Sequence, residues 1–438
     1  MGSITLFDWL IWSVYFVLIF IGMFIYRSTK QEDHNKYYVR GLLIKILGGV
    51  AFALIYVYYY KFGDTFLYHR GAIVLSESLL SDPSDYFRLL FSTNNQIPPD
   101  LTEYAAQISF SRTYEEWFMV KLLSPLNMLG FNSYLTVTLF TSILSFWGAW
   151  KLFLVFRDLI PRYSKYAFYI VFLTPTVTFW GGGIMKDTFT LVAINLIIYH
   201  LYFGIFKGKF RIIDFLVIGI AGYIIIGLKA YVLLAFIPGI TYALYLNFKD
   251  RINNRILKFI LGPTILVALI GVSVYTVQTL SDSSLKYSSQ NLEYQVRGFH
   301  SWHTDVGGSS YNLGQIEFTT TGILSKIPEA LNVTFFRPYI WESSNVVVAL
   351  TAVESLFVLV LFLIALFRTG HKFFKHMRKS PFVLGLFIYA LIFGFAVGFT
   401  SYNFGALARY KIPVLSLFIL VLAYIIISTK KELSDSTQ

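Results

Sequence analysis

Hydrophobic residues recur along the chain in runs long enough to cross a membrane. The first run, Phe7–Tyr26, holds one acidic residue, Asp8, at its edge. About 20 apolar residues in a helix span a hydrocarbon core of about 30 Å, and a helix satisfies its own backbone hydrogen bonds there. We therefore predict an all-α, polytopic membrane helix bundle in which residues 1–438 form a single membrane domain.

The pattern predicts about 11 transmembrane helices. They cover Phe7–Tyr26, Gly41–Tyr60, Asn132–Phe156, Tyr166–Trp180, Thr188–Phe206, Ile212–Leu228, Tyr231–Asn247, Ile256–Val277, Val346–Phe367, Phe382–Phe399 and Ile412–Ser428. The polar break at 227–230 is short, so Ile212–Asn247 is either two spans or a re-entrant hairpin. No basic segment or small-residue cleavage site precedes Tyr26, which favours retention of the first run as a span.

Basic residues gather in every second loop, for example at Arg27, Arg157, Lys207, Arg251 and Arg368. Lys and Arg are enriched on cytoplasmic loops of membrane proteins, so this alternation places the N-terminus outside and the C-terminus in the cytoplasm. The net charge of +12 follows mostly from this topology and does not call for a nucleic-acid partner. Without cysteines, the chain has no disulfides or thiol chemistry.

Two segments on the predicted outer face, residues 61–131 and 278–345, are too long to be simple connectors. The first is expected to carry interfacial helices, one from Asp64 to Leu80 and one from Tyr114 to Met128 that Pro125 kinks or ends. ATP is absent outside the cell. A reaction on this face therefore needs an energised substrate, such as a sugar linked to a polyprenyl phosphate.

Asp64 opens the first outer segment directly after a span. A carboxylate at the membrane surface can act as a general base toward an acceptor hydroxyl. The same residue, followed by Thr65, is also typical of a helix N-cap. Both interpretations stay open, and they do not exclude each other.

Three glycines at 181–183 precede Lys186 and Asp187 at the start of a span. Glycine allows close backbone approach to a ligand, and a helix N-terminus with a lysine suits phosphate. The alternative is a tight turn with Lys186 extended toward the membrane surface.

The second outer segment holds aromatic and charged residues. His300, His303 and Asp305 fall short of a metal-binding signature, whereas the Trp302 ring suits stacking on a sugar. Arg337 and Glu342 either hold a phosphate or pair with each other to anchor the loop.

Arg409, Tyr410 and Lys411 place two cations on the outer face, against the charge trend, which indicates an anionic partner such as a lipid-linked phosphate. Glu354 lies inside a predicted span. Acids in a membrane usually face the bundle interior, so Glu354 either has a proton or ligand role or bonds to a neighbouring helix.

These features resemble the GT-C superfamily of membrane glycosyltransferases that use lipid-linked sugars. The resemblance rests on residues 63–68, on the Arg-Tyr-x-x-Pro pattern at 409–413 and on the large outer loops. Residues 172–187 and, more loosely, 336–342 resemble bacterial exopolysaccharide and O-antigen polymerases. The superfamily's usual second acid after the first is missing beside Asp64.

The resemblance implies a glycosyltransferase or polysaccharide polymerase of the bacterial inner membrane, with Asp64 as the catalytic base. The predicted substrate-binding residues are His69, Arg70, Lys186, Asp187, Trp302, Arg337, Glu342, Arg409, Tyr410 and Lys411. Implied partners are a lipid-linked sugar donor, a glycan acceptor, membrane lipids and other polysaccharide-synthesis proteins. No cofactor is assigned, and a divalent cation stays open.

Two other classes of function stay open. A transporter or flippase of lipid-linked glycans is expected to have internal repeats and discontinuous helices with sites near the membrane midplane. A non-enzymatic scaffold is expected to lack a polar cavity joining Asp64, Lys186 and Arg409. The sugar, the linkage and the choice between polymerase and single-sugar transferase do not follow from these residues.

Overall fold

The computed structural model describes residues 4–29, 35–249, 264, 310–314, 317 and 319–435. In these ranges the regular elements are helices. They are α1 (Leu6–Thr29), α2 (Asn35–Leu54), η1 (Ile55–Tyr60), α3 (Asp64–Ser81), α4 (Pro83–Phe91), η2 (Pro99–Leu101), α5 (Thr102–Gln107), α6 (Tyr114–Leu129), α7 (Tyr134–Leu159), η3 (Pro161–Tyr163), α8 (Ser164–Leu173), α9 (Pro175–Trp180), α10 (Lys186–Leu201), η4 (Tyr202–Phe206), α11 (Ile212–Lys229), α12 (Tyr231–Phe248), α15 (Thr320–Ser325), α16 (Ile327–Phe336), η6 (Ile340–Glu342), α17 (Val346–Thr369), η7 (Gly370–Lys372), α18 (Phe373–Arg378), α19 (Pro381–Thr400), α20 (Phe404–Tyr410) and α21 (Ile412–Asp435).

Nine helices in this part of the chain are long and apolar enough to cross a membrane. An all-α membrane bundle is thus confirmed in outline, with one difference from the predicted spans, and the count of 11 stays a prediction. Tyr166–Trp180 is not one helix, because the chain breaks at Thr174 and Pro175 into α8 and the six-residue α9. The predicted span Ile256–Val277 lies outside the described residues, apart from one position.

The region Ile212–Asn247, predicted as either two spans or a re-entrant hairpin, forms two helices of 18 residues each, α11 and α12. They meet at Ala230. Helix α11 packs against α10, whereas α12 packs against α19. The short polar break therefore separates two helices with different neighbours, each long enough to be a span.

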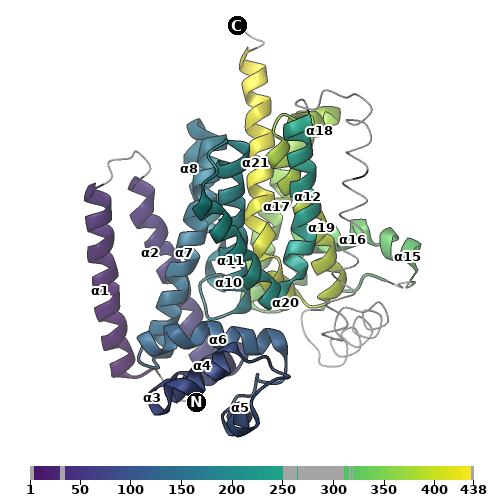
Figure 1. Ribbon diagram of the computed structural model, residues 1–438. Coiled ribbons are helices and arrows are strands. Elements are labelled where there is room, and N and C mark those ends of the chain that lie inside the picture. Colours follow the sequence, from purple (N-terminus) through teal and green to yellow (C-terminus); the bar gives the residue numbers. More distant parts are fainter. Residues whose placement is uncertain are drawn as a thin grey trace.

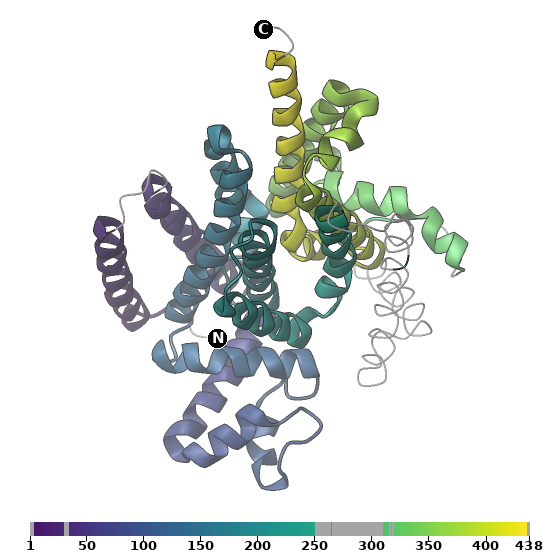
Figure 2. The same cartoon turned by 45° about the horizontal axis from the view of Figure 1, so that its top comes forward.

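Helices α3, α4 and α6 gather at the end of the bundle where α1 begins, and α21 runs to the opposite end (Figures 1 and 2). Both predicted outer helices are present, although α6 continues through Pro125 to Leu129. Trp117 and Leu123 of α6 are buried with Tyr68 and Leu75 of α3 in a separate small core. The segment predicted to lie on the outer face is thus a packed unit and not a simple connector.

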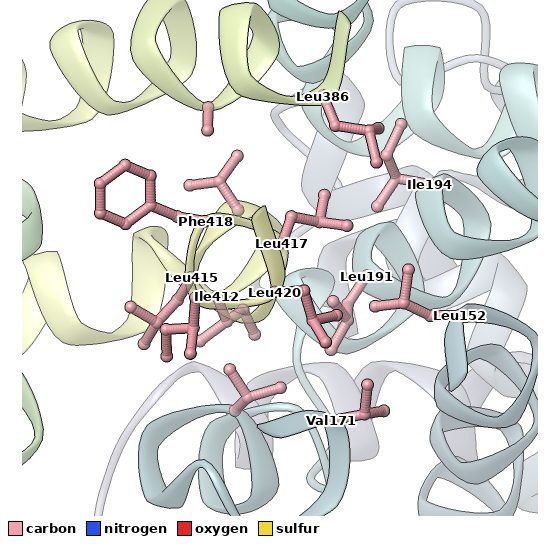
Figure 3. Packing of buried hydrophobic residues seen from close by; sticks show 14 of the residues in the cluster. Leu152, Val171, Leu191, Ile194, Leu386, Ile412, Leu415, Leu417, Phe418 and Leu420 are labelled. Atoms are coloured by element: carbon pink, nitrogen blue, oxygen red, sulfur yellow. The ribbon is translucent and has the colours of Figure 1, made fainter. Parts of the chain in front are cut away.

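The main core surrounds α21, which lies near the middle of the bundle (Figure 1). In Figure 3, Leu417 and Leu420 of α21 are surrounded by apolar side chains of α7, α8, α10 and α19. In contrast, α1 is almost unburied along its apolar length and packs mainly on α7. Helix α20 ends directly before α21 and is thus attached to the best-packed part of the bundle.

Candidate functional site

Asp187, the second residue of α10, lies at the centre of a cluster of charged side chains. Its side chain is 3% exposed. One carboxylate oxygen accepts a hydrogen bond from Lys229 Nζ at the end of α11. The other lies 3.8 Å from Arg409 Nε of α20. A buried carboxylate needs such partners, because removal from water without them is costly.

Arg409 also approaches Asp64, the first residue of α3, with 3.6 Å between a terminal nitrogen and Oδ2. Side-chain exposure rises from 3% at Asp187 to 21% at Arg409 and 47% at Asp64. The guanidinium thus lies between a buried and an exposed carboxylate. We call Asp64, Asp187, Lys229, Arg409 and Tyr410 the Asp187 cluster.

The contacts of Arg409 are loose for a buried arginine. Both carboxylates lie beyond the usual hydrogen-bond distance of about 3.2 Å. Nε has no hydrogen-bond partner among the described residues, and a terminal nitrogen donates to Tyr410 Oη at 3.4 Å. Burial lowers the pKa of Arg409, but the neighbouring Asp187 carboxylate and tyrosine hydroxyls outweigh it, so the pKa is raised. The group stays cationic and has donors left for a ligand.

Tyr410 closes the cluster on the side of Lys229. Lys229 Nζ lies 4.6 Å from the centre of the Tyr410 ring, and the Arg409 guanidinium lies 5.2 Å from the same ring. Such contacts stabilise cations where water is scarce. The predicted residues Asp64, Asp187, Arg409 and Tyr410 therefore come together, although they are far apart in the chain.

Lys186 is paired beside this cluster and not within it. Its Nζ lies 2.7 Å from Glu116 Oε1 of α6, and both side chains are less than one-fifth exposed. Tyr68 of α3 is buried, at 2% exposed. Burial raises the pKa of Tyr68, and the charges of Asp64, Glu116 and Asp187 raise it further. The Tyr68 hydroxyl thus stays protonated and can donate a hydrogen bond.

Two local features of the chain place Asp64. The N-cap of α3 is Gly63, at φ 136°, and no side chain caps the helix, so the N-cap interpretation of Asp64 is wrong. A Cβ on Gly63 would also lie 2.8 Å from the Tyr56 ring. Glycine therefore permits the backbone conformation between η1 and α3, and Asp64 begins the next helix with its side chain 47% exposed.

The three glycines before Lys186 are buried. A Cβ on Gly183 would lie 2.2 Å from the Phe52 ring of α2, and the Gly182 carbonyl accepts hydrogen bonds from Ser142 and Thr141 of α7. This packing against α2 and α7 agrees with the tight-turn alternative and gives no support to a ligand contact through this backbone. The turn instead fixes where α10, and so Asp187, begins.

His69 and Arg70 lie on α3 but away from the cluster. The His69 ring is 5.4 Å from the Tyr134 ring, and burial lowers its pKa to about 4. It is a neutral group packed between α3 and α7. Arg70 is exposed. Neither side chain is brought to Asp64, so their predicted sugar contact gains no support from position.

Arg337 and Glu342 form a closed pair. Arg337 Nε lies 3.1 and 3.0 Å from the two Glu342 oxygens, and a terminal nitrogen also bonds to Glu342. Glu342 additionally accepts a hydrogen bond from the Tyr339 backbone at 2.8 Å. This geometry matches the anchoring interpretation, in which the pair holds the loop before α17.

Lys411 is fully buried and donates to Ser355 Oγ of α17 at 3.3 Å. The predicted contact of Lys411 with a phosphate at the outer surface is not supported, because its side chain faces the bundle interior. Trp302, like His300, His303 and Asp305, lies outside the described residues. Within the described ranges, no three His, Asp or Glu side chains are grouped to hold a metal ion.

Sequence reasoning missed Lys229, Glu116 and Tyr68. Lys229 carried a usable signal, because it is a cation at a predicted outer turn and so departs from the charge trend, as Arg409 does. Glu116 and Tyr68 lie in helices of ordinary composition, where no such signal exists. Three carboxylates and three cations meet around the site, so its charges balance.

Comparison of the chain with protein-family models, with curated proteins and with solved structures finds no match.

Proposed function

We propose that the chain is a membrane glycosyltransferase or polysaccharide polymerase that uses a sugar linked to a polyprenyl phosphate or pyrophosphate. The observation that carries this proposal is the sharing of Arg409 between Asp64 and Asp187. It joins a solvent-accessible carboxylate to a cation with unused donors at one end of an apolar helix bundle. The phosphate of a lipid-linked donor, and the bond that breaks in the reaction, lie at the membrane surface, which is where one end of such a bundle lies.

In the proposed reaction, the acceptor hydroxyl attacks the anomeric carbon of the donor sugar. A carbon–oxygen bond to the acceptor forms while the bond from that carbon to the phosphate oxygen breaks. The Asp64 carboxylate takes the hydroxyl proton, and the polyprenyl (pyro)phosphate leaves with the bonding electron pair. A positioned general base contributes about 10²–10⁴-fold to such a step.

The Arg409 guanidinium is suited to bind the phosphate of the leaving group. A phosphate within hydrogen-bond distance would outcompete the carboxylates at 3.6 and 3.8 Å, because charge-assisted bonds to guanidinium are strongest near 2.8 Å. Its arrival would detach Asp64 from Arg409 and leave that carboxylate free as a base. Lys229 lies beside the same guanidinium and adds positive charge where the leaving group gains negative charge.

The setting is proposed to be the bacterial inner membrane, with α3–α6 on the outer face. The Lys- and Arg-rich loops would then lie in the cytoplasm, in agreement with the rule for basic residues. Sugar acceptors and membrane lipids would reach the Asp187 cluster from the side where Asp64 is exposed.

Transfer in reconstituted vesicles tests the proposal. The purified protein in lipid vesicles receives a polyprenyl-pyrophosphate-linked sugar and a glycan acceptor, and the product is measured by mass spectrometry. Asp64→Asn is expected to reduce transfer by about 100-fold or more. Asp85→Asn is the matched control, since Asp85 is an acid of the same outer segment whose contact is with Arg88 at 3.3 Å.

Equal transfer by Asp64→Asn and the wild-type protein would refute the base assignment. A wild-type protein that transfers no sugar from a panel of such donors, yet moves them between leaflets, would support the transporter alternative. One observation favours that second candidate: α8 and α9 form a discontinuous helix inside the bundle, with Lys45 donating to the Val177 carbonyl at 3.2 Å.

A further inference from the structure

Glu354 lies within the candidate span of α17 and is 5% exposed. Its Oε2 accepts a hydrogen bond from the backbone nitrogen of Thr176 at 2.8 Å. Thr176 is the second residue of α9, directly after the break in the helix at Thr174 and Pro175. The carboxylate thus satisfies an amide group that the broken helix leaves without an internal partner.

Helix α9 depends on such outside support. It has six residues, and a helix this short is not stable by its own hydrogen bonds. Lys45 donates a hydrogen bond to the Val177 carbonyl within α9, and Glu354 accepts one from the Thr176 amide in its first turn. Its last residue leads into the buried glycine turn, where Thr188 Oγ donates to the Trp180 and Gly183 carbonyls at 3.2 and 2.7 Å. A displacement of α9 is therefore passed on to Asp187, the residue before Thr188.

Ser355, the residue after Glu354 on α17, contacts the segment that carries Arg409. Lys411 Nζ donates to Ser355 Oγ, and Lys411 follows Arg409 by two residues. Ser355 Oγ in turn donates to the Arg337 carbonyl at 3.0 Å. Helix α17 contacts both α9 and α20. Adjacent residues of one helix thus anchor the segment that carries Asp187 and the segment that carries Arg409.

Glu354 and Lys411 are both buried in the bundle interior, at 5% and 0% exposed. Among the described residues, the second oxygen of Glu354 has no hydrogen-bond partner. A buried acid with an unfilled acceptor is costly, and such groups in a membrane are usually kept for a role. Removal of one charge would leave the other unpaired, which must be controlled in any test.

We propose that Glu354 is a positioning residue for the Asp187 cluster: by capping α9 it sets the place of Asp187, and through Asp187 the place of Arg409 beside Asp64. The inference rests on the proposed function for what the cluster does, but its geometry can be tested separately. Glu354 itself touches no substrate in this account.

Two double variants isolate the cap. Glu354→Gln/Lys411→Met retains an oxygen that can accept the Thr176 amide, whereas Glu354→Leu/Lys411→Met does not. Both remove the same two charges, so neither leaves an unpaired ion. If the leucine variant does not fold, Glu354→Ala in the same background takes its place. Asp214→Asn controls for general loss of a buried acid, because Asp214 bonds to His200 at 2.6 Å, near the junction of η4 and α11.

The first readout needs no enzymatic activity. Because the chain has no cysteine, Asp64→Cys introduces a single thiol next to Arg409. An ordinary cysteine titrates near pH 8.5, and an adjacent cation lowers that value by about one unit or more. The pH dependence of alkylation therefore reports whether Arg409 is in place.

Both double variants lack the Lys411 anchor, so they are compared with each other. We expect the thiol to titrate at lower pH in the Gln/Met background than in the Leu/Met background, where it should lie near about pH 8.5, and to stay lowered in the Asp214→Asn background. In otherwise unmodified Asp64 protein, kcat/KM for sugar transfer should be about tenfold or more lower in Leu/Met than in Gln/Met. Identical thiol titrations in both double variants would overturn the inference. A thiol shift as expected, in a protein that transfers no sugar, would retain the positioning role and refute the proposed function.

Discussion

Two arginines, Arg337 and Arg409, are both paired with acids, but in different ways. Arg337 lies 3.0–3.1 Å from both oxygens of Glu342, and that acid also binds the Tyr339 backbone. Arg409 lies 3.6 and 3.8 Å from two different acids, and its Nε has no hydrogen-bond partner among the described residues. A closed pair holds a loop, whereas a shared and incompletely bonded arginine can take an anion. The comparison separates an anchor from a candidate binding group.

The largest expected effect is at Arg409. Arg409→Gln should lower kcat/KM for transfer by about 100-fold or more, equivalent to about 2.7 kcal/mol, because it removes the cation proposed to bind the leaving phosphate. Folding should persist, since Asp187 keeps Lys229 as its partner. Kinetics in vesicles, with Arg337→Gln as the parallel variant, measures the difference. Equal losses in both variants would remove the distinction between the two arginines.

The framework that carries Asp187 gives the next prediction. Gly183→Ala should destabilise the protein by about 2 kcal/mol, because the new methyl group would meet the Phe52 ring at 2.2 Å in a packed interior. Thermal unfolding in detergent measures this effect. Gly219→Ala is the control on α11, where a Cβ meets nothing within 4 Å, and there alanine should be neutral or stabilising.

The pH dependence of stability tests the opposite face of α3. Burial lowers the pKa of His69 to about 4 in the folded protein, against 6.5 as the ordinary value. The unfolded chain therefore binds the proton first as pH falls, so this residue's contribution to stability is present above pH 6.5 and is lost as pH drops toward 4. From pH 7 to pH 5 the loss should be about 2 kcal/mol.

His69→Gln should remove that part of the pH dependence when unfolding is followed at both pH values. A pH dependence equal to that of the wild-type protein would show that His69 is not buried as a neutral ring, and would reopen its predicted role near the substrate.

The smallest effect is expected at the anchor. Arg337→Gln should cost about 1 kcal/mol of stability, since the pair is partly exposed and other contacts hold the loop, and should leave transfer within about threefold.

Acid should weaken the ion pair of Arg337 and Glu342. Burial raises the pKa of Glu342, but bonds from Arg337 and the Tyr339 backbone outweigh it and lower the pKa below 4.5. The contribution of Glu342 is thus present above pH 4.5 and is lost below it.

Much of the bundle could be predicted, because hydrophobic length is a local property of the sequence. Helix α3 begins at Asp64 as expected, since the apolar pattern and the preceding glycine are both local. The break at Pro175 was missed because Tyr166–Trp180 carries no charged residue, although a proline inside a span is a signal for a break. The acceptor that supports the broken helix, Glu354, is 178 residues away and could not be found from spacing.

The candidate site was predicted in part. Asp64, Asp187, Arg409 and Tyr410 were selected by charge and position relative to the spans, and they meet. Lys411 was selected by the same signal and faces the interior, because the direction of a side chain at a helix junction depends on packing against α17. Lys229 meets Asp187 only through the contact of α11 with α10, which single-sequence patterns do not contain.

Binding of a short-chain isoprenyl pyrophosphate to the detergent-solubilised full-length protein tests the central claim most directly, without requiring turnover. Calorimetry should detect binding by the wild-type protein and by Arg337→Gln, and a loss of about tenfold or more in affinity for Arg409→Gln. Tight binding that persists in Arg409→Gln but disappears in Arg337→Gln would contradict the account, because the anion would then bind at the arginine assigned as the anchor.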